Sequence, residues 1–119
     1  MCIKVLQCQF ANLVGFNFSN LKLDFVDFSV ARLAGAQFIR AGLKQASFIR
    51  ADLARVDFTG ANLTSVNFTA ASLAGADLTN ANLTNTVICG VDLESIIGLT
   101  EKQLGDVQVY REKGNRYCP

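Results

Sequence analysis

The chain has 119 residues, with 11 Lys and Arg against 10 Asp and Glu, so its formal net charge is +1 and its length fits one domain. This balance excludes wholesale electrostatic binding to nucleic acid or to an anionic membrane. The absence of His excludes a Ser-His-Asp relay, a Cys-His relay and any His-ligated metal site. We therefore predict a protein that is not an enzyme, with no catalytic residues, no cofactor and no metal site.

Membrane and targeting segments are not visible in the sequence. No run approaches the roughly 18 to 20 uninterrupted apolar residues of a membrane span, and residues 1–10 lack the layout of a signal peptide. The expected location is the cytoplasm, with no membrane association.

An apolar residue recurs at every fifth position from Leu13 to Leu93, and a mostly small apolar residue precedes it by two positions. A period of five fits neither an α-helix nor a long strand, and predicts a short extended segment followed by a turn. Each unit is too small to bury its own apolar face, so the units are stable only when stacked into a solenoid. Residues 1–10 follow the same register weakly and are expected to add half a coil.

The length of one coil follows from the large apolar residues, which alternate between Leu and Phe from Leu13 to Leu73. A coil of fifteen residues would stack Leu on Phe, whereas a coil of twenty stacks like on like. The alternation thus predicts four pentapeptides per coil, a square cross-section and two columns of stacked rings. The columns are Phe18, Phe38 and Phe58 on one wall, and Phe28, Phe48 and Phe68 on the opposite wall.

The units at residues 51–55, 61–65 and 81–85 read ADLAR, ANLTS and ANLTN. They resemble the A-(D/N)-L-x-x repeat of pentapeptide repeat proteins, and the resemblance extends over residues 11–95. It implies an all-β solenoid, the right-handed quadrilateral β-helix of that family.

The repeat is expected to form a domain over residues 1–98, followed by a short capping α-helix and an irregular tail over residues 99–119. Thr100 is the predicted N-cap, and Gln103 completes a capping box. A helix of about ten residues, ending before Gly114, would cover the unpaired edge of the last coil.

Four cysteines are present, and they include no C-x-x-C pair, which argues against a zinc site. Cys8 occupies an inward position and is interpreted as a small core residue. Cys89 is expected to face outward on the final coil, where a folded-back tail would let it form a disulfide with Cys118. The alternative is that all four thiols are reduced, as is usual in the cytoplasm.

Charge is distributed unevenly, because residues 31–55 carry five cations and one Asp whereas residues 56–98 carry four acids and no cation. A twenty-residue coil places Lys44 over Asp24, where an ion pair is expected. Outward acids such as Asp52 have no second carboxylate beside them, so we expect them to hydrogen-bond along the stack and not to bind calcium.

Arg40, Arg50 and Arg55 have no acid above or below them in a coil of twenty residues, and Ile39 and Ile49 lie next to the first two. Arg beside an exposed branched apolar residue is typical of an interface anchor, which makes these five residues one candidate protein-binding surface. The alternative is a solvated belt of charge.

The first coil has Phe10, Val14, Phe25 and Val30 at outward or corner positions, where later coils mostly have small or polar residues. An apolar, uncapped end predicts association there, either as a homodimer or with a preceding domain. The alternative is local packing against residues 1–10.

Two larger residues also replace the usual Ala at inward positions of the first coil. They are Phe16 and Leu21, and we expect them to plug the mouth of the coil.

These observations favour a non-enzymatic scaffold that binds a protein partner whose identity the sequence does not give. Family resemblance supplies an alternative, since some pentapeptide repeat proteins mimic DNA and protect type II topoisomerases such as gyrase from quinolones. A DNA duplex carries one negative charge per about 1.7 Å of its axis, which this near-neutral chain with a basic middle does not match. Binding of nucleic acid itself is not expected.

Overall fold

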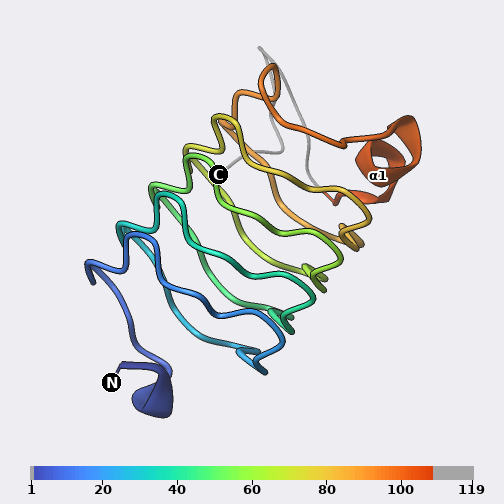
Figure 1. Cartoon of the computed structure of the whole chain (residues 1–119). Helices are drawn as coiled ribbons and strands as arrows, with labels where there is room; N and C mark the ends of the chain where they lie inside the picture. Colours follow the sequence, from blue (N-terminus) through green and yellow to red (C-terminus); the bar gives the residue numbers. More distant parts are fainter. Residues whose placement is uncertain (1, 109–119) are drawn as a thin grey trace.

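A computed structural model describes residues 2–108 of the chain. The backbone winds into stacked coils, as Figure 1 shows. Parallel bridges join residues twenty positions apart, beginning with Gln7 and Asp27 and running to Asp77 and Ile97. The predicted pairing between successive coils is therefore present. The bridges are isolated, and no continuous strand forms in the described part, because a turn interrupts each extended segment.

The turns recur every five residues and share one backbone geometry. At one of them Gly35 has φ +71°, and the N–H of Ala36 donates to the carbonyl of Leu33 at 2.9 Å, as in a type II turn. Along residues 2–108, thirteen non-glycine residues also adopt positive φ, between 56° and 69°. Since such a conformation usually favours Gly or Asn, the coil imposes it on side chains that do not prefer it.

The core is an interior of inward-pointing Leu, Phe and Ala side chains. The two predicted Phe columns are confirmed, since Phe18 stacks on Phe38 with ring centroids 5.0 Å apart and Phe28 stacks on Phe48 at 5.1 Å. The columns also touch each other, because Phe28 meets Phe38 edge-on at 5.7 Å. Aromatic contacts of both kinds add about 0.5–1.5 kcal/mol per pair beyond the buried area.

Asn and Asp at the central outward position of a unit bond within their own coil, so the prediction that such residues bond along the stack is wrong. Oδ1 of Asp57 accepts from the N–H of Thr59 at 2.9 Å and from its hydroxyl at 2.5 Å. The carboxylate of Asp52 likewise accepts the N–H of Ala54 at 3.2 Å. The turn begins at this point of the unit, and it brings the amide two residues ahead within reach of a short Asx side chain.

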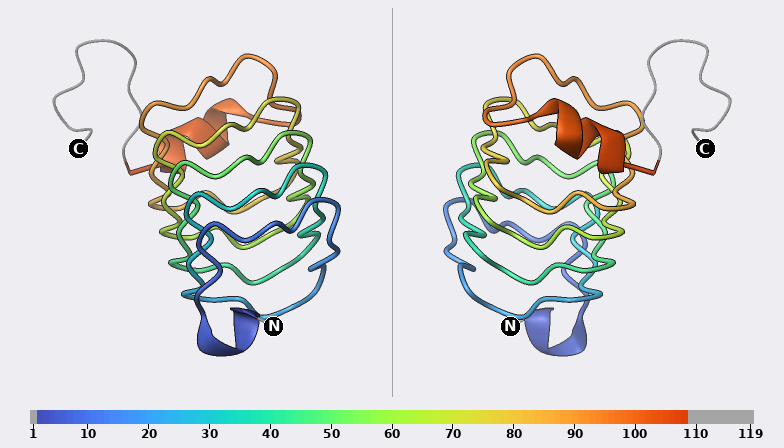
Figure 2. Two further views of the ribbon diagram at one scale, coloured as in Figure 1. Left: turned by 90° about the vertical axis from the view of Figure 1, so that its left-hand side faces the viewer. Right: turned by 90° about the vertical axis from the view of Figure 1, so that its right-hand side faces the viewer.

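The N-terminal residues depart from the repeat. Cys2–Val5 form a short 3-10 helix, η1, instead of the predicted half coil, and the regular pairing begins only at Gln7. The other helix, α1, spans Glu101–Asp106 near the opposite end of the stack, as Figure 2 shows.

The N-terminus of α1 is as predicted, since Thr100 and Gln103 form a reciprocal capping box with bonds of 2.8 and 3.1 Å. The Gln103 amide also donates to the carbonyl of Leu78 at 2.8 Å, which ties the helix to the coil below. The helix ends at Asp106 and is therefore shorter than predicted. It ends there because the N–H of Gln108 donates to the carbonyl of Thr86 in the coil and not to a carbonyl of the helix.

Candidate functional site

Large exposed hydrophobic side chains are concentrated at one end of the stack. Of the nine in residues 2–108, eight fall in the first thirty residues, and the ninth is Ile97. We call this set the N-terminal apolar end. Its members are Val5, Leu6, Phe10, Val14, Phe16, Leu21, Phe25 and Val30.

The four residues singled out from the sequence all belong to this set. Phe10 is 74% exposed and Phe25 is 58% exposed, so η1 and the residues after it do not cover them. Phe10 and Val30 occupy the same corner of successive coils, since they are twenty residues apart, and Phe25 occupies the neighbouring corner. Val14 precedes Gly15, which forms the corner that follows Phe10 along the chain.

Phe16 and Leu21 do not form the buried plug that the sequence predicted. Each is 43% exposed, although the ring of Phe16 stacks on Phe18 at 5.9 Å. In later coils the equivalent position is buried because another coil lies on both sides. Here no described residue forms a coil below residues 11–24, so a larger side chain at this position reaches solvent.

The backbone of the same end presents an open edge. Asn12, Asn17 and Lys22 each bridge a residue of the next coil, but no described residue bridges them from the other side. By contrast, Asp27 bridges both Gln7 and Ser47. An edge of this kind offers free peptide groups to another chain. The exposed apolar side chains and the open backbone edge thus lie at one end.

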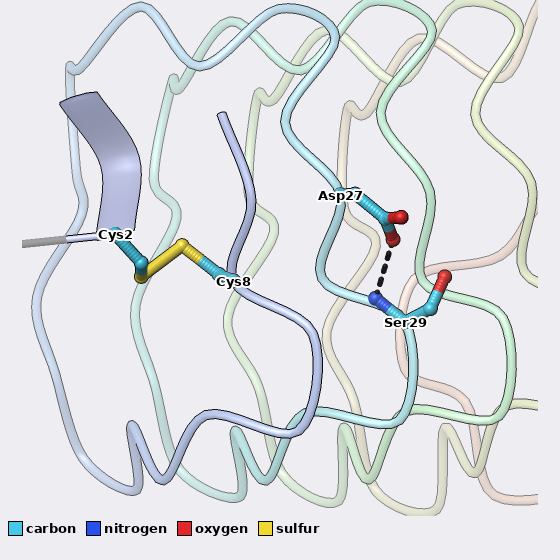
Figure 3. Close-up of a disulfide and its surroundings, with 4 residues drawn as sticks. All are labelled: Cys2, Cys8, Asp27 and Ser29. Carbon is cyan, nitrogen blue, oxygen red and sulfur yellow. Dashed lines mark hydrogen bonds between the residues drawn. A yellow bond between two sulfur atoms is a disulfide. The ribbon is translucent and has the colours of Figure 1, made fainter. Parts of the chain in front are cut away.

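A disulfide joins Cys2 to Cys8, with their Cα atoms 5.1 Å apart, and Figure 3 shows it close to Asp27 and Ser29. The prediction that Cys8 is a core residue is confirmed, because it is 1% exposed, but its bond to Cys2 contradicts the expectation of four reduced thiols.

Cys89 was expected to face outward, and the structure corrects this, because the residue is 2% exposed. Its predicted partner, Cys118, lies outside the described residues, so that pairing stays a prediction.

The basic candidate residues lie at separate corners of the coil. Arg40, Arg50 and Arg55 are exposed at three corners with φ between 56° and 59°. Ile39 and Ile49, which would complete an interface, are half-buried. Arg40 is engaged within the stack, since its Nε donates to Asn20 Oδ1 at 3.3 Å, where the twenty-residue repeat places the two residues on one corner.

The predicted ion pair between Lys44 and Asp24 is not formed. The Asp24 carboxylate accepts the backbone N–H of Lys44 at 3.0 Å instead. Within residues 2–108 the one ion pair joins Lys102 and Asp106 on α1. The backbone amide is held at a fixed place by the coil, whereas a long Lys side chain must lose rotamer freedom to pair.

The other surface features of the described residues are a groove beside α1 and scattered charged side chains. An open groove of about 660 Å³ runs beside α1, lined by residues that include Asn80, Asn82, Thr84 and Lys102. Residues 2–108 contain no cluster of three or more Cys, Asp or Glu side chains that would hold a metal ion. Neither helix in this part of the chain has the length and apolar character needed to cross a membrane.

Comparison with known proteins places the chain in a family. A model of the pentapeptide repeat region matches residues 21–97. A solved pentapeptide repeat protein from the thylakoid lumen of Arabidopsis thaliana is 30% identical, with 82% of this chain and 72% of that chain covered and a TM-score of 0.51. The chain therefore belongs to the pentapeptide repeat family, whose members form right-handed β-helices.

Two cyanobacterial proteins share the fold. Rfr23 from Cyanothece 51142 is 21% identical, with 78% of this chain and 91% of that chain covered and a TM-score of 0.54. HetL from Nostoc sp. strain PCC 7120, a protein involved in heterocyst differentiation regulation, is 24% identical, with 76% and 52% covered and a TM-score of 0.50. None of the curated proteins matches the sequence significantly.

Proposed function

We propose that this chain is a non-enzymatic protein-binding solenoid and that its partner docks on the N-terminal apolar end. The observation that carries the proposal is the concentration of eight exposed large hydrophobic side chains at that end of the described chain. Exposed apolar patches on soluble proteins mark interaction sites, because leaving them in water costs about 25 cal/mol per Å².

The architecture that presents this surface is a quadrilateral coil of four pentapeptides, with α1 as the cap of the opposite end. Bridges between residues twenty apart and a turn at every fifth residue support the four-sided coil. The bonds from Gln103 to the carbonyls of Leu78 and Ala81 support the cap, because they occupy backbone acceptors of the last coil. The repeat domain is assigned to residues 1–98, and the cap and tail to residues 99–119.

The proposal is tested by capturing partners from a lysate of the source organism with four versions of the chain. The wild type is compared with a Phe25→Ser, Val30→Ser variant, an Arg40→Glu, Arg50→Glu, Arg55→Glu variant, and Ile97→Ser. Ile97 is the matched control, because it is 53% exposed but lies far from residues 5–30 in the coil order. All variants change exposed residues, and their folding is checked by circular dichroism.

We expect a specific partner to be lost with the Phe25, Val30 variant and retained with the other two. Loss with the Arg variant alone would move the binding surface to the basic corners. Capture of a type II topoisomerase that is abolished by salt would favour the DNA-mimic alternative, since a charge-based contact is screened within about 10 Å at 0.1 M salt. An apolar contact at the N-terminal end should survive moderate salt.

A further inference from the structure

We propose that the occupant of the N-terminal apolar end is the same end of a second copy of this chain, in a two-fold symmetric dimer. This inference rests on the proposed function and names its partner. In such a contact the same patch is used twice, so the patch must be large enough, complementary to itself and free of net repulsion.

The exposed area is large enough for a specific contact. Phe10, Phe16 and Phe25 are 74%, 43% and 58% exposed, so the three rings alone present about 350 Å². With the five aliphatic members of the end, each copy offers on the order of 700 Å², close to the roughly 800 Å² per partner of a standard interface.

The open backbone edge is complementary to itself. Peptide groups at Asn12, Asn17 and Lys22 face away from the stack without a bridging residue from the described chain. Under a two-fold axis, two such edges run antiparallel to each other and can exchange backbone hydrogen bonds. The inward side chains at this end, Phe16 and Leu21, would then continue the apolar core from one copy into the other.

The charges of the end are balanced, so two copies do not repel. Residues 2–30 carry Lys4, Lys22, Asp24 and Asp27, which is two cations against two acids. A two-fold contact allows Lys22 of one copy to face Asp24 of the other. Residues 31–55 carry five cations and one acid, so a contact between copies at the basic corners would be repulsive.

Three of the exposed apolar residues lie at turns of the coil. Phe10, Phe25 and Val30 have φ of +63°, +69° and +60°, which is the left-handed region. An L-residue pays about 1–2 kcal/mol there, and a β-branched Val is an outlier. The equivalent turn position holds Asn at residues 80 and 85, where no such conflict arises. The same positive φ recurs at ten other non-glycine residues between residues 2 and 108, so the turn geometry is that of the whole stack. Phe10, Phe25 and Val30 matter for the contact because they are large, apolar and exposed.

The first test substitutes Val30→Asn, which separates folding from association. Asn tolerates positive φ, so the Tm of the monomer is expected to rise by about 4 °C. The same change removes an apolar side chain from the contact twice per dimer, and the dissociation constant measured by sedimentation equilibrium should rise about tenfold. Opposite effects on folding and on association are not expected of a residue that serves the fold alone.

The second test compares Phe10→Ser, Phe25→Ser with Ile97→Ser by light scattering over a range of protein concentrations. The wild type and Ile97→Ser should have the mass of a dimer, and the double Phe variant that of a monomer, with at least about a hundredfold weaker association. A wild type that stays monomeric at every concentration, or equal dissociation by Ile97→Ser, would overturn the proposal. If a monomeric wild type still captures a partner that depends on Phe25 and Val30, the end binds another protein and the proposed function stands.

Discussion

Replacing Phe48 with Ala is expected to lower the free energy of unfolding by about 3–5 kcal/mol, the usual cost of emptying a buried aromatic site. Phe48 is fully buried, and its ring stacks on Phe28 at 5.1 Å and on Phe68 at 5.4 Å. Phe38 and Phe58 meet it edge-on, both at 5.7 Å. The cavity cannot collapse easily, because the coils above and below hold their spacing through backbone hydrogen bonds.

The control is Phe10→Ala, which removes the same atoms from a side chain that is 74% exposed. Measured by urea denaturation in dilute solution, it should change the free energy of unfolding by no more than about 0.5 kcal/mol. A double-mutant cycle between Phe48 and Phe68 should give a coupling of about 0.5–1.5 kcal/mol, because they stack at twenty residues' separation. Additive effects would contradict the proposed coil of four pentapeptides.

Replacing Gly98 with Ala is expected to detach the end of the chain from the stack, at a cost of more than about 2 kcal/mol. Gly98 has φ +78°, and a Cβ added there would approach Thr79, with its Oγ1, Cα and N within 2.2, 2.8 and 2.9 Å. Positive φ alone is not the obstacle, since thirteen non-glycine residues of the described chain adopt it. Lack of space is the larger cause, and two of the three atoms belong to the backbone of the neighbouring coil.

Hydrogen exchange at Ile97 and Gln108 measures this effect, because their amides donate to the coil at Ala76 and Thr86. Both amides should exchange much faster in Gly98→Ala. Gly35→Ala is the matched control, with φ +71° and no atom within 4 Å of an added Cβ, and it should leave both amides unchanged. Adding Thr79→Ala to Gly98→Ala should not restore protection. If it does, the hydroxyl and not the backbone causes the conflict.

The periodic part of the fold was predictable because each unit repeats the same physical problem. The alternation of Leu and Phe at inward positions was enough to place Phe28 under Phe48, since a coil of twenty residues stacks like side chains and one of fifteen does not. The capping box of Thr100 and Gln103 was predictable for a different reason, because it is a local exchange of two hydrogen bonds. Neither inference required knowledge of distant contacts.

The ends of the stack were predicted less well, because the repeat gives no information where it stops. Residues 2–5 leave the register of the repeat and form η1, which brings Cys2 next to Cys8. The periodic pattern of the sequence does not predict this contact. Phe16 occupies an inward position, so it was expected to be buried, but it is 43% exposed because no described residue forms a coil below it. Helix α1 ends early because Gln108 pairs again with the coil, a contact that depends on the three-dimensional position of Thr86.

The candidate surface was found in part from the sequence. Phe10, Val14, Phe25 and Val30 stood out as apolar residues at positions that later coils fill with small or polar ones. The open backbone edge beside them became visible only in the structure, because it depends on which bridges are present.

The central claim is that protein binds at the N-terminal end of the stack and not on one of its sides. Hydrogen–deuterium exchange in dilute and in concentrated solution tests this claim most directly. The amides of Asn12 and Asn17, which have no backbone partner in the described chain, should exchange more slowly in concentrated solution as the two ends come together. Gly60 and Ser65 in the middle of the stack should exchange equally under both conditions, since their amides already donate to the next coil. Slower exchange centred on Arg40, Arg50 and Arg55, with no change at Asn12 and Asn17, would contradict a binding surface at the N-terminal end.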